Sequence, residues 1–375
     1  MIISSVIAGQ KSWTIVNNTI SLSLTEMGGM MAPVTFFKDT DKPVNPFYIN
    51  PWAEEKIDMT GQPGLLTPIR GDFFCLPFGG NNSWKNEHHP PHGEVSEEKW
   101  QLTSGGDTSR IELQLKTKSR KGKIIKQIDL RPGENNIYIC HKIQGFTGPT
   151  SLGHHPIFPG GTKKYISTSP IKFGITDYRL PGPFRNGEYF SLAPAEEFKN
   201  LEKVPTIWKD EPYTDCSVFP ARDGFIDHLQ LFNEEAPGFA WSAVSAPEDG
   251  YLWFGLKDPK VLPSTLVWIE NRGRHQTPWN GRNSCVGVED VCSFLAHGLA
   301  ASVEENDINR QGIKTFQKLT GKEDFQVRYI QGLVKIPGNF GKVSEIIPKG
   351  NGIEIKSENG EKVTTKVDPG FLNLQ

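Results

Sequence analysis

The sequence predicts an all-β fold of antiparallel strands, on three observations. Residues 110–143 hold three runs in which apolar and polar side chains alternate, separated by the turn segments SRKG and RPGEN; this pattern is typical of a meander. Further strand-like runs recur as FAWSAV, GYLWFGLK and STLVWIENR. The gaps between the runs are too short for crossover helices, which disfavours a parallel α/β sheet.

Glycine and proline are abundant along the whole chain. The 38 glycines and 28 prolines show no repeat period, which indicates many turns rather than disorder. One helix is predicted over 291–305, where apolar residues recur at three-to-four spacing although Gly298 interrupts them. We expect a main β domain over 1–322 and a β appendage over 323–375 packed on it, in which the segment ENG predicts a hairpin.

Charge and composition exclude several classes of partner. The formal net charge is −2, so no basic field exists for nucleic acid or anionic lipid, and no apolar run approaches the roughly 20 residues that span a bilayer. The start, MIISSVIAGQKSW, lacks the features of an export signal, which favours a cytoplasmic protein. Five cysteines without regular spacing predict reduced, buried thiols. The expected partner is a neutral or weakly charged small molecule, and the oligomeric state is left open.

Two charged residues each allow a functional and a structural interpretation. Arg70, in PIRGDFFCLPFGGNN, carries a rigid fork of donors that can bind two adjacent ligand oxygens; alternatively, it caps carbonyl groups at a strand end. Asp227, in DGFIDHLQLF, can accept hydrogen bonds from hydroxyl groups of a ligand. Its alternative is a turn aspartate that accepts nearby backbone amides.

A histidine-rich segment, EHHPPHGEVSEEKW, covers residues 87–100. Imidazole and carboxylate are common metal ligands, but the spacing matches no familiar metal motif. A second interpretation is a polar wall that donates hydrogen bonds to a ligand, with Trp100 as a stacking surface; the third is a solvated loop. The residues concerned are His88, His89, His92 and Glu94.

The segment SLGHHPIFPGG places His155 in a rigid turn. Pro156 favours an extended conformation for the residue before it. Because the ordinary pKa of histidine lies near neutrality, a histidine held in this way suits proton transfer. The alternative is a core histidine that is hydrogen-bonded to a carbonyl group.

Glu289 lies between apolar neighbours in CVGVEDV. An apolar setting raises the pKa of a carboxyl group toward the range of a useful base, whereas the alternative is a salt-bridged strand residue. Trp268 and Trp279, in the same stretch of sequence, offer flat apolar surfaces that can stack on the C–H face of a sugar.

Taken in order, these motifs resemble the galactose mutarotase (aldose 1-epimerase) superfamily over about residues 10–300. GHHPIF resembles the family's acid motif, with His154 where asparagine is usual, and VGVED resembles the base motif, with Asp290 where proline is usual. The residues that carry the resemblance are Arg70, His92-Gly93-Glu94, Trp100, His155-Pro156, Asp227-His228 and Glu289.

The resemblance implies a large twisted antiparallel β-supersandwich whose concave face binds an aldopyranose without a metal or organic cofactor. It implies interconversion of α and β anomers, with Glu289 as the base and His155 as the acid, facing each other across a gap one hexose wide. Glu94 would bind a hydroxyl or orient His92. The implied substrate-binding residues are Arg70, His92, Glu94 and Asp227.

Three other functions remain open on the sequence. One is a non-catalytic carbohydrate-binding protein on the same scaffold, because function resides in the site rather than in the fold. Another is a hexose-6-phosphate 1-epimerase, in which Arg272, Arg274 and Arg282 would bind the phosphate. The last is a cupin-like metalloenzyme, suggested only by the histidine-rich segment.

Overall fold

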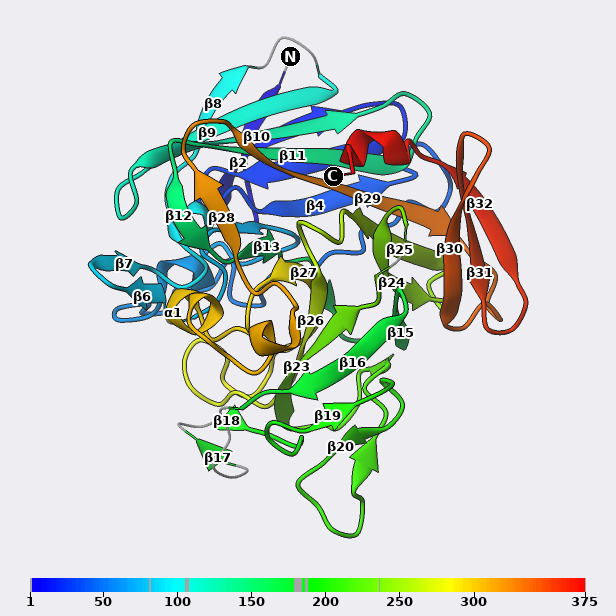
Figure 1. Ribbon diagram of the computed structural model, residues 1–375. Coiled ribbons are helices and arrows are strands. Elements are labelled where there is room, and N and C mark those ends of the chain that lie inside the picture. The colour runs from blue at the N-terminus through cyan, green and yellow to red at the C-terminus, as the bar shows by residue number, and fades with distance from the viewer. Residues whose placement is uncertain are drawn as a thin grey trace.

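The computed structural model describes residues 2–80, 82–104, 108–178, 184–185, 188–235 and 237–374, with only the backbone of 184 and 185. Within these residues the regular secondary structure consists almost entirely of antiparallel strands, in two large sheets and several small ones (Figure 1). No helix in the described part of the chain is long and apolar enough to span a membrane.

The first large sheet has nine strands and contains the predicted meander as β9, β10 and β11. Burial alternates along β9 and β10, where every second side chain faces the core, whereas β11 is buried over most of its length. In sheet order the strands are β22 (Val218–Phe219), β15 (Lys164–Thr168), β24 (Ala240–Ala246), β25 (Tyr251–Lys257), β29 (Phe325–Lys335), β11 (Asn136–Gln144), β10 (Gly122–Leu130), β9 (Arg110–Thr117) and β8 (Gln101–Ser104).

The second large sheet has eight strands and carries the candidate site. Its central strands β26 and β27 are buried at every residue except Ser284, because one face packs on the first sheet and the other lies under long loops. In sheet order the strands are β19 (Glu197–Phe198), β16 (Ile171–Thr176), β23 (Phe225–Asn233), β26 (Ser264–Asn271), β27 (Ser284–Cys292), β13 (Leu152–His154) and β5 (Phe74–Cys75), with β14 (Ile157–Pro159) also paired to β27.

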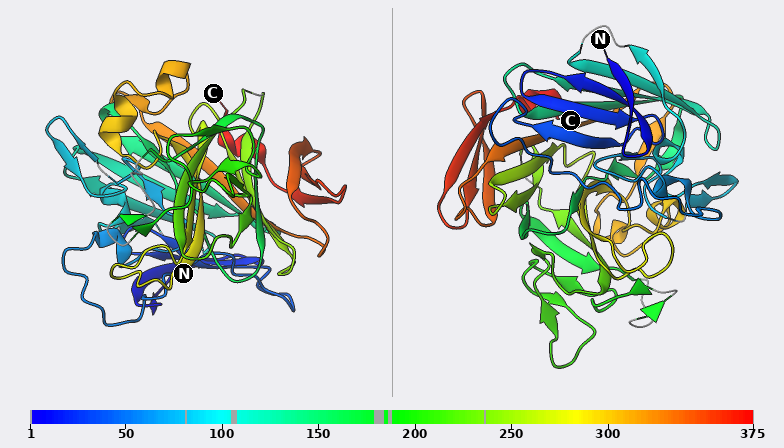
Figure 2. Two further views of the ribbon diagram at one scale, coloured as in Figure 1. Left: turned by 90° about the horizontal axis from the view of Figure 1, so that it is seen from below. Right: turned by 180° about the vertical axis from the view of Figure 1, so that it is seen from behind.

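The two large sheets cross, as the meander and the strands β23, β26 and β27 show in Figure 1. A four-stranded sheet covers the back of the nine-stranded sheet, as seen from behind in Figure 2. The core between the layers joins apolar side chains from all three sheets. The four-stranded sheet consists of β1 (Ile3–Ile7), β2 (Gln10–Val16), β3 (Ile20–Thr25) and β4 (Met31–Phe36).

The remaining elements are short and lie around this sandwich. The paired strands are β12 (Thr147–Thr150) with β28 (Gln317–Thr320), β6 (Asn82–Trp84) with β7 (Glu87–His89), β17 (Phe184–Arg185) with β18 (Glu188–Tyr189), and β20 (Val204–Pro205) with β21 (Tyr213–Thr214). The helices are η1 (Gly64–Leu66), η2 (Glu94–Ser96), α1 (Leu299–Val303), η3 (Asn309–Gln311) and η4 (Pro369–Leu372).

The C-terminal region divides differently from the expected boundary at 322/323. β29 pairs with both β11 and β25, so it is an interior strand of the nine-stranded sheet rather than part of an appendage. The separate unit is a three-stranded sheet of β30 (Val343–Lys349), β31 (Gly352–Ser357) and β32 (Lys362–Lys366), at one side of the molecule in Figure 1. The ENG hairpin joins β31 to β32, as predicted.

The predicted helix over 291–305 is mostly absent. Val291 and Cys292 continue β27 and pair with β26 and β13, so strand pairing determines the first part of this segment. Only the five residues Leu299–Val303 are helical, directly after Gly298. All five cysteines are buried and free, as the spacing predicted.

Candidate active site

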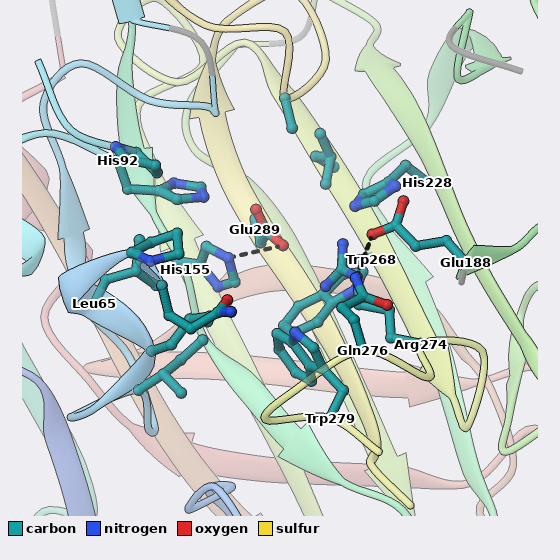
Figure 3. Close-up of a pocket in the computed structure, with 17 residues that line it drawn as sticks. Leu65, His92, His155, Glu188, His228, Trp268, Arg274, Gln276, Trp279 and Glu289 are labelled. Atoms are coloured by element: carbon teal, nitrogen blue, oxygen red, sulfur yellow. Dashed lines mark hydrogen bonds and ion pairs between the residues drawn. The ribbon is translucent and has the colours of Figure 1, made fainter. Parts of the chain in front are cut away.

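A cavity of about 320 Å³ lies over the face of the eight-stranded sheet that points away from the sandwich core. Its volume lies in the range of small-molecule sites. Three strands supply its floor, and the loops that contain η1, His92 and Trp279 supply its walls. Figure 3 shows these side chains converging on Glu289.

The register between β23, β26 and β27 determines which side chains form the floor of the cavity. Glu289 on β27 lies opposite Leu266 on β26, and Gly287 lies opposite Trp268, which is in turn opposite His228 on β23. Because directly opposed residues share a face, these side chains form one patch. A Cβ on Gly287 would lie 2.5 Å from Oε1 of Glu289, so the glycine provides the space that the carboxyl group occupies.

His155 and Glu289 are in direct contact. Nε2 of His155 lies 3.3 Å from Oε1 of Glu289, and the two side chains are only 5% and 2% exposed (Figure 3). The sequence led us to expect a gap one hexose wide between them. A separation of 3.3 Å leaves no room for a sugar between the groups, so a ligand has to meet both from one side.

Residues 72 and 73 hold His155 in place. The backbone N–H of His155 donates to Oδ1 of Asp72 at 2.9 Å and to the carbonyl of Phe73 at 3.0 Å. The Phe73 ring stacks on the imidazole at a centroid distance of 4.5 Å. Asp72 also accepts hydrogen bonds from His154 Nδ1 and from Gln331 on β29, which ties the turn to the opposite sheet.

His92 lines the cavity beside His155, with ring centroids 5.1 Å apart. Its backbone is left-handed, at φ 59°, and Gly93 follows at φ 80°. A Cβ at Gly93 would lie 1.8 Å from the Leu76 carbonyl oxygen, so this tight turn requires a glycine after the histidine. The turn directs the His92 ring edge-on toward Phe78.

An ion pair and two tryptophans form the opposite wall (Figure 3). Arg274 Nε donates to Oε1 of Glu188 at 2.9 Å, and Gln276 Nε2 donates to the same oxygen at 3.3 Å. The Arg274 guanidinium lies 5.5 Å from the ring centroid of Trp268 and 4.9 Å from that of Trp279. This wall combines flat apolar surface with fixed polar groups.

Burial shifts the pKa values of Glu289, His155 and His92 toward their neutral forms. It raises the pKa of Glu289 well above its usual value, because a carboxylate loses its hydration there. It lowers the pKa of His155 well below its usual value, with a further contribution from His92. Burial also lowers the pKa of His92, to about 4.

Several buried polar atoms of the cavity residues have no hydrogen-bond partner within the described parts of the chain. They are His92 Nδ1, His155 Nδ1, Trp268 Nε1 and Gln276 Oε1. Buried polar groups are normally satisfied, so four such atoms around one cavity favour a site for a polar ligand.

Comparison with solved structures identifies the architecture. A candidate aldose 1-epimerase from Escherichia coli K12 superimposes with a TM-score of 0.58 at 12% identity, covering 88% of this chain and 100% of that one. A galactose mutarotase related enzyme from Lactobacillus acidophilus gives 0.54 at 14% identity, covering 87% and 98%. The chain has the galactose mutarotase-like fold. No family model and no curated protein matches the sequence itself.

On this mutarotase-like scaffold, strand alternation separates neighbouring residues of the sequence motifs. His228 lines the cavity, whereas Asp227 faces the other side of β23. There Asp227 accepts hydrogen bonds from the backbone amides of Ser191 and Leu192 and pairs with Arg222 at 3.3 Å. The expected hydroxyl-binding role therefore has no geometric support at Asp227, and His228 occupies the corresponding place.

Arg70 also lies outside the cavity. It is fully buried, and its guanidinium donates to the carbonyls of Pro68, Ile7 and Ala8 at 2.8 to 3.1 Å. This is the structural alternative that the sequence allowed, because the donors that would bind a substrate are used to anchor the β1–β2 hairpin.

Only part of the histidine-rich segment reaches the cavity. His92 reaches the cavity, whereas Glu94 accepts hydrogen bonds from the Lys118 and Ser119 amides. The Trp100 indole is buried and donates to the Val95 carbonyl, so it offers no stacking surface. The other two histidines lie on β7, where they contact Ser83 and Glu87. Within the described ranges, no group of three potential ligand side chains is placed to hold a metal.

Sequence reasoning missed part of the cavity. Glu188 belongs to a two-residue strand with no periodic signal. Leu65 and Leu66 come from η1, inside a long irregular segment. Gln276 lies in the RGRHQTPWNGR loop, where three arginines and Trp279 carry the more distinctive pattern. None of these residues has a local pattern that distinguishes it from a loop residue.

Proposed function

We propose that this protein is an aldose 1-epimerase that interconverts the α and β anomers of an aldopyranose. The observation that carries the proposal is the contact between His155 and Glu289 in a cavity of mutarotase-like architecture. Anomer exchange requires a group that accepts the proton of the C1 hydroxyl and a group that protonates the ring oxygen. An imidazole and a carboxyl group 3.3 Å apart supply both functions.

The proposed reaction needs only proton transfer and bond rotation. The ring opens when the C1 hydroxyl loses its proton and the ring oxygen gains one, which gives an open-chain aldehyde. Rotation about C1–C2 and reclosure, with the proton transfers reversed, produce the other anomer. Each positioned acid or base typically contributes about 10²–10⁴-fold to the rate, and both groups return to their starting state.

The walls of the cavity suit a neutral pyranose. Trp268 and Trp279 provide surfaces that can stack on the C–H face of a sugar. His92, His228 and Gln276 lie where they can bind its hydroxyls. Holding the sugar in this way aligns the C1 end with the catalytic pair, which is the part of the rate enhancement that positioning supplies.

The arginines do not favour a phosphorylated sugar. Arg282 pairs with Glu55 through two bonds of 2.6 and 2.7 Å, and Arg272 pairs with Asp223 at 2.6 Å. Arg274 is the one arginine of this loop that lines the cavity, and Glu188 offsets its charge. A phosphate would have to compete with these carboxylates, so we propose a free sugar as the substrate.

An NMR panel tests the proposed function. The rate of exchange between anomers is measured for several free aldoses and for their 6-phosphates, with and without the protein. We expect acceleration for at least one free sugar and its loss in His155→Asn. Saturable sugar binding without acceleration would contradict the proposal and indicate a carbohydrate-binding protein. Acceleration of phosphorylated sugars alone would contradict the choice of substrate.

A further inference from the structure

Glu188 and Arg274 form a fixed ion pair in the wall of the cavity. Nε of Arg274 donates to Oε1 of Glu188 at 2.9 Å, and the backbones of the two residues form an isolated antiparallel bridge. Beside that bridge, the amide of Tyr189 donates to the carbonyl of Gly273 at 3.0 Å. Main-chain and side-chain contacts both hold the pair, so a ligand that binds to it loses little free energy in ordering it.

This wall offers donors and acceptors side by side. A guanidinium carries five N–H donors, and within the described part of the chain Nε is the one nitrogen of the Arg274 guanidinium with a hydrogen-bond partner. The edge formed by the two terminal nitrogens can therefore serve a ligand in the cavity. The neighbouring acceptors are the second carboxylate oxygen of Glu188 and the side-chain oxygen of Gln276, whose nitrogen donates to Glu188 at 3.3 Å.

The charges of this wall favour hydroxyl groups over an anion. Glu188 balances Arg274, and the Glu270 carboxyl group is a second acidic group, with Oε2 3.8 Å from Arg274 Nε. An anion would therefore gain little net attraction. A hydroxyl both donates and accepts, so it can use the arginine and the glutamate together. Hydroxyls on two neighbouring ring carbons present paired oxygens, which suit the two parallel N–H donors of a guanidinium edge.

The order of the strands determines which hydroxyls reach this wall. His155 follows β13, Glu289 lies on β27 and Trp268 lies on β26, and these strands are neighbours in that order. Arg274 and Glu188 lie beyond Glu289 as seen from His155 (Figure 3). Neighbouring strands are about 5 Å apart, so a pyranose whose C1 end lies over β27 extends across β26. With the ring oxygen at His155 and the C1 hydroxyl at Glu289, the carbons that follow in this direction are C2 and C3.

We propose that Glu188, Arg274 and Gln276 bind the vicinal hydroxyls on C2 and C3 and so determine which sugars are substrates. The inference rests on the proposed epimerase function, with Glu289 at the C1 hydroxyl and His155 at the ring oxygen. Arg274 donates to the two sugar oxygens, while Glu188 and Gln276 accept from their hydroxyl protons. The substrate class is an uncharged aldopyranose that carries a hydroxyl on both carbons.

This binding mode suits the movement that anomer exchange requires. After ring opening, the aldehyde carbon turns about the C1–C2 bond, and the other face of the carbonyl is presented to the oxygen that closes the ring. A wall that holds C2 and C3 leaves C1 free to turn and keeps the rest of the chain aligned for reclosure. Such positioning contributes to the rate as well as to binding.

A panel of deoxy sugars tests the inference on the wild-type protein. Anomer exchange of D-glucose and D-galactose is compared with that of their 2-deoxy, 3-deoxy and 6-deoxy analogues, each rate being divided by the spontaneous rate of the same sugar. We expect kcat/KM to fall by about 10- to 100-fold for the 2-deoxy and 3-deoxy analogues, because each loses hydrogen bonds to charged groups. The loss for the 6-deoxy analogue should be smaller. Equal values for the parent sugar and its 2-deoxy and 3-deoxy analogues would overturn the proposal.

Arg274→Lys assigns the discrimination to this wall. Lysine keeps the charge but lacks the planar fork of donors, so the preference for the parent sugar over its 3-deoxy analogue should fall toward one. This preference is a ratio and does not depend on the amount of folded protein. Glu55→Gln is the matched control, because Glu55 pairs with Arg282 away from the cavity, and it should leave the ratio unchanged. A ratio that Arg274→Lys also leaves unchanged would contradict the assignment.

Calorimetric binding of the same sugars separates this inference from the proposed function. Selective binding of the parent sugars without any acceleration would refute the epimerase function and support the diol site. Acceleration without discrimination against the 2-deoxy and 3-deoxy analogues would refute the diol site alone. Neither selective binding nor acceleration would refute both.

Discussion

Polar side chains on the two faces of the eight-stranded sheet differ in how many polar partners they have. On the interior face, Asp290 accepts hydrogen bonds from Thr265, Ser242 and Tyr329 at 2.6 to 2.8 Å and pairs with Lys257 at 2.5 Å. On the cavity face, its chain neighbour Glu289 contacts His155 alone among the charged groups of the described chain. One peptide bond separates a carboxylate with four polar partners from a carboxyl group in ionic contact with one histidine.

The adjacent histidines His154 and His155 also face opposite sides of the sheet. His154 faces the interior, where it contacts Asp72 at 2.9 Å and stacks on Tyr329, whereas His155 faces the cavity. The interior groups join the two sheets and so contribute to stability. The cavity groups keep unpaired capacity, which a ligand can use. Burial alone does not distinguish the two sets, because both are almost inaccessible to solvent.

The largest effect on activity is expected for Glu289→Gln. The amide has nearly the same shape but cannot exchange a proton, so anomer exchange should fall by about 10²–10⁴-fold. Polarimetry or NMR measures the exchange, and circular dichroism verifies the fold. Full activity in this variant would remove the carboxyl group from the mechanism.

Asp290→Asn should give the opposite result. It leaves the Lys257 ammonium buried without its counter-charge, and breaking a buried pair in this way typically costs about 3–5 kcal/mol of stability. Urea unfolding measures the loss, with Glu289→Gln as the matched control, which should change stability by much less. Equal losses in the two variants would show that the two faces do not differ as described.

Gly287→Ala tests the space beneath the carboxyl group. The added methyl group would lie 2.5 Å from Glu289 Oε1 and displace it, and a small misplacement of a catalytic group can cost up to about 10²-fold in rate. We expect kcat to fall by about 10- to 100-fold while the protein stays folded. Gly338→Ala, whose added methyl group would have no neighbour within 4 Å, is the control and should leave kcat unchanged.

The smallest effect is a pH dependence of stability. The pKa of His92 is lowered to about 4 in the folded protein from about 6.5 in the unfolded chain, so the unfolded state binds more protons between these values. Stability is therefore fully present above about pH 6.5 and declines as pH falls toward 4, by about 1–3 kcal/mol. Urea unfolding at several pH values measures the slope, which His92→Gln should reduce. An unchanged slope in the variant would contradict the buried neutral state of His92.

The sequence revealed the fold more completely than the site. Alternating runs identified the meander because one face of each strand is buried, and the order of motifs indicated the mutarotase-like architecture. The interior position of β29 could not be predicted, since its partners β11 and β25 are brought beside it by the tertiary fold.

For the site, the structure brings three of the predicted catalytic and substrate-binding residues together at the cavity, His92, His155 and Glu289, and the predicted stacking residues Trp268 and Trp279 also line it. Asp227 and His228 show why the others were not resolved: adjacent residues on a strand face opposite sides, and sequence does not say which side holds the ligand. Arg70 shows a second reason. A buried arginine and a substrate-binding arginine have the same sequence pattern, and only its backbone partners distinguish them.

The position of β29 also determines when the nine-stranded sheet can form during synthesis. Residues 136–144 and 251–257 lie far earlier in the chain, yet they flank β29 in the finished sheet. During synthesis, each neighbour therefore has one open hydrogen-bonding edge until residues 325–335 have been made. Such edges can pair with other chains, and we expect cells to need chaperone protection for this protein until that strand is inserted.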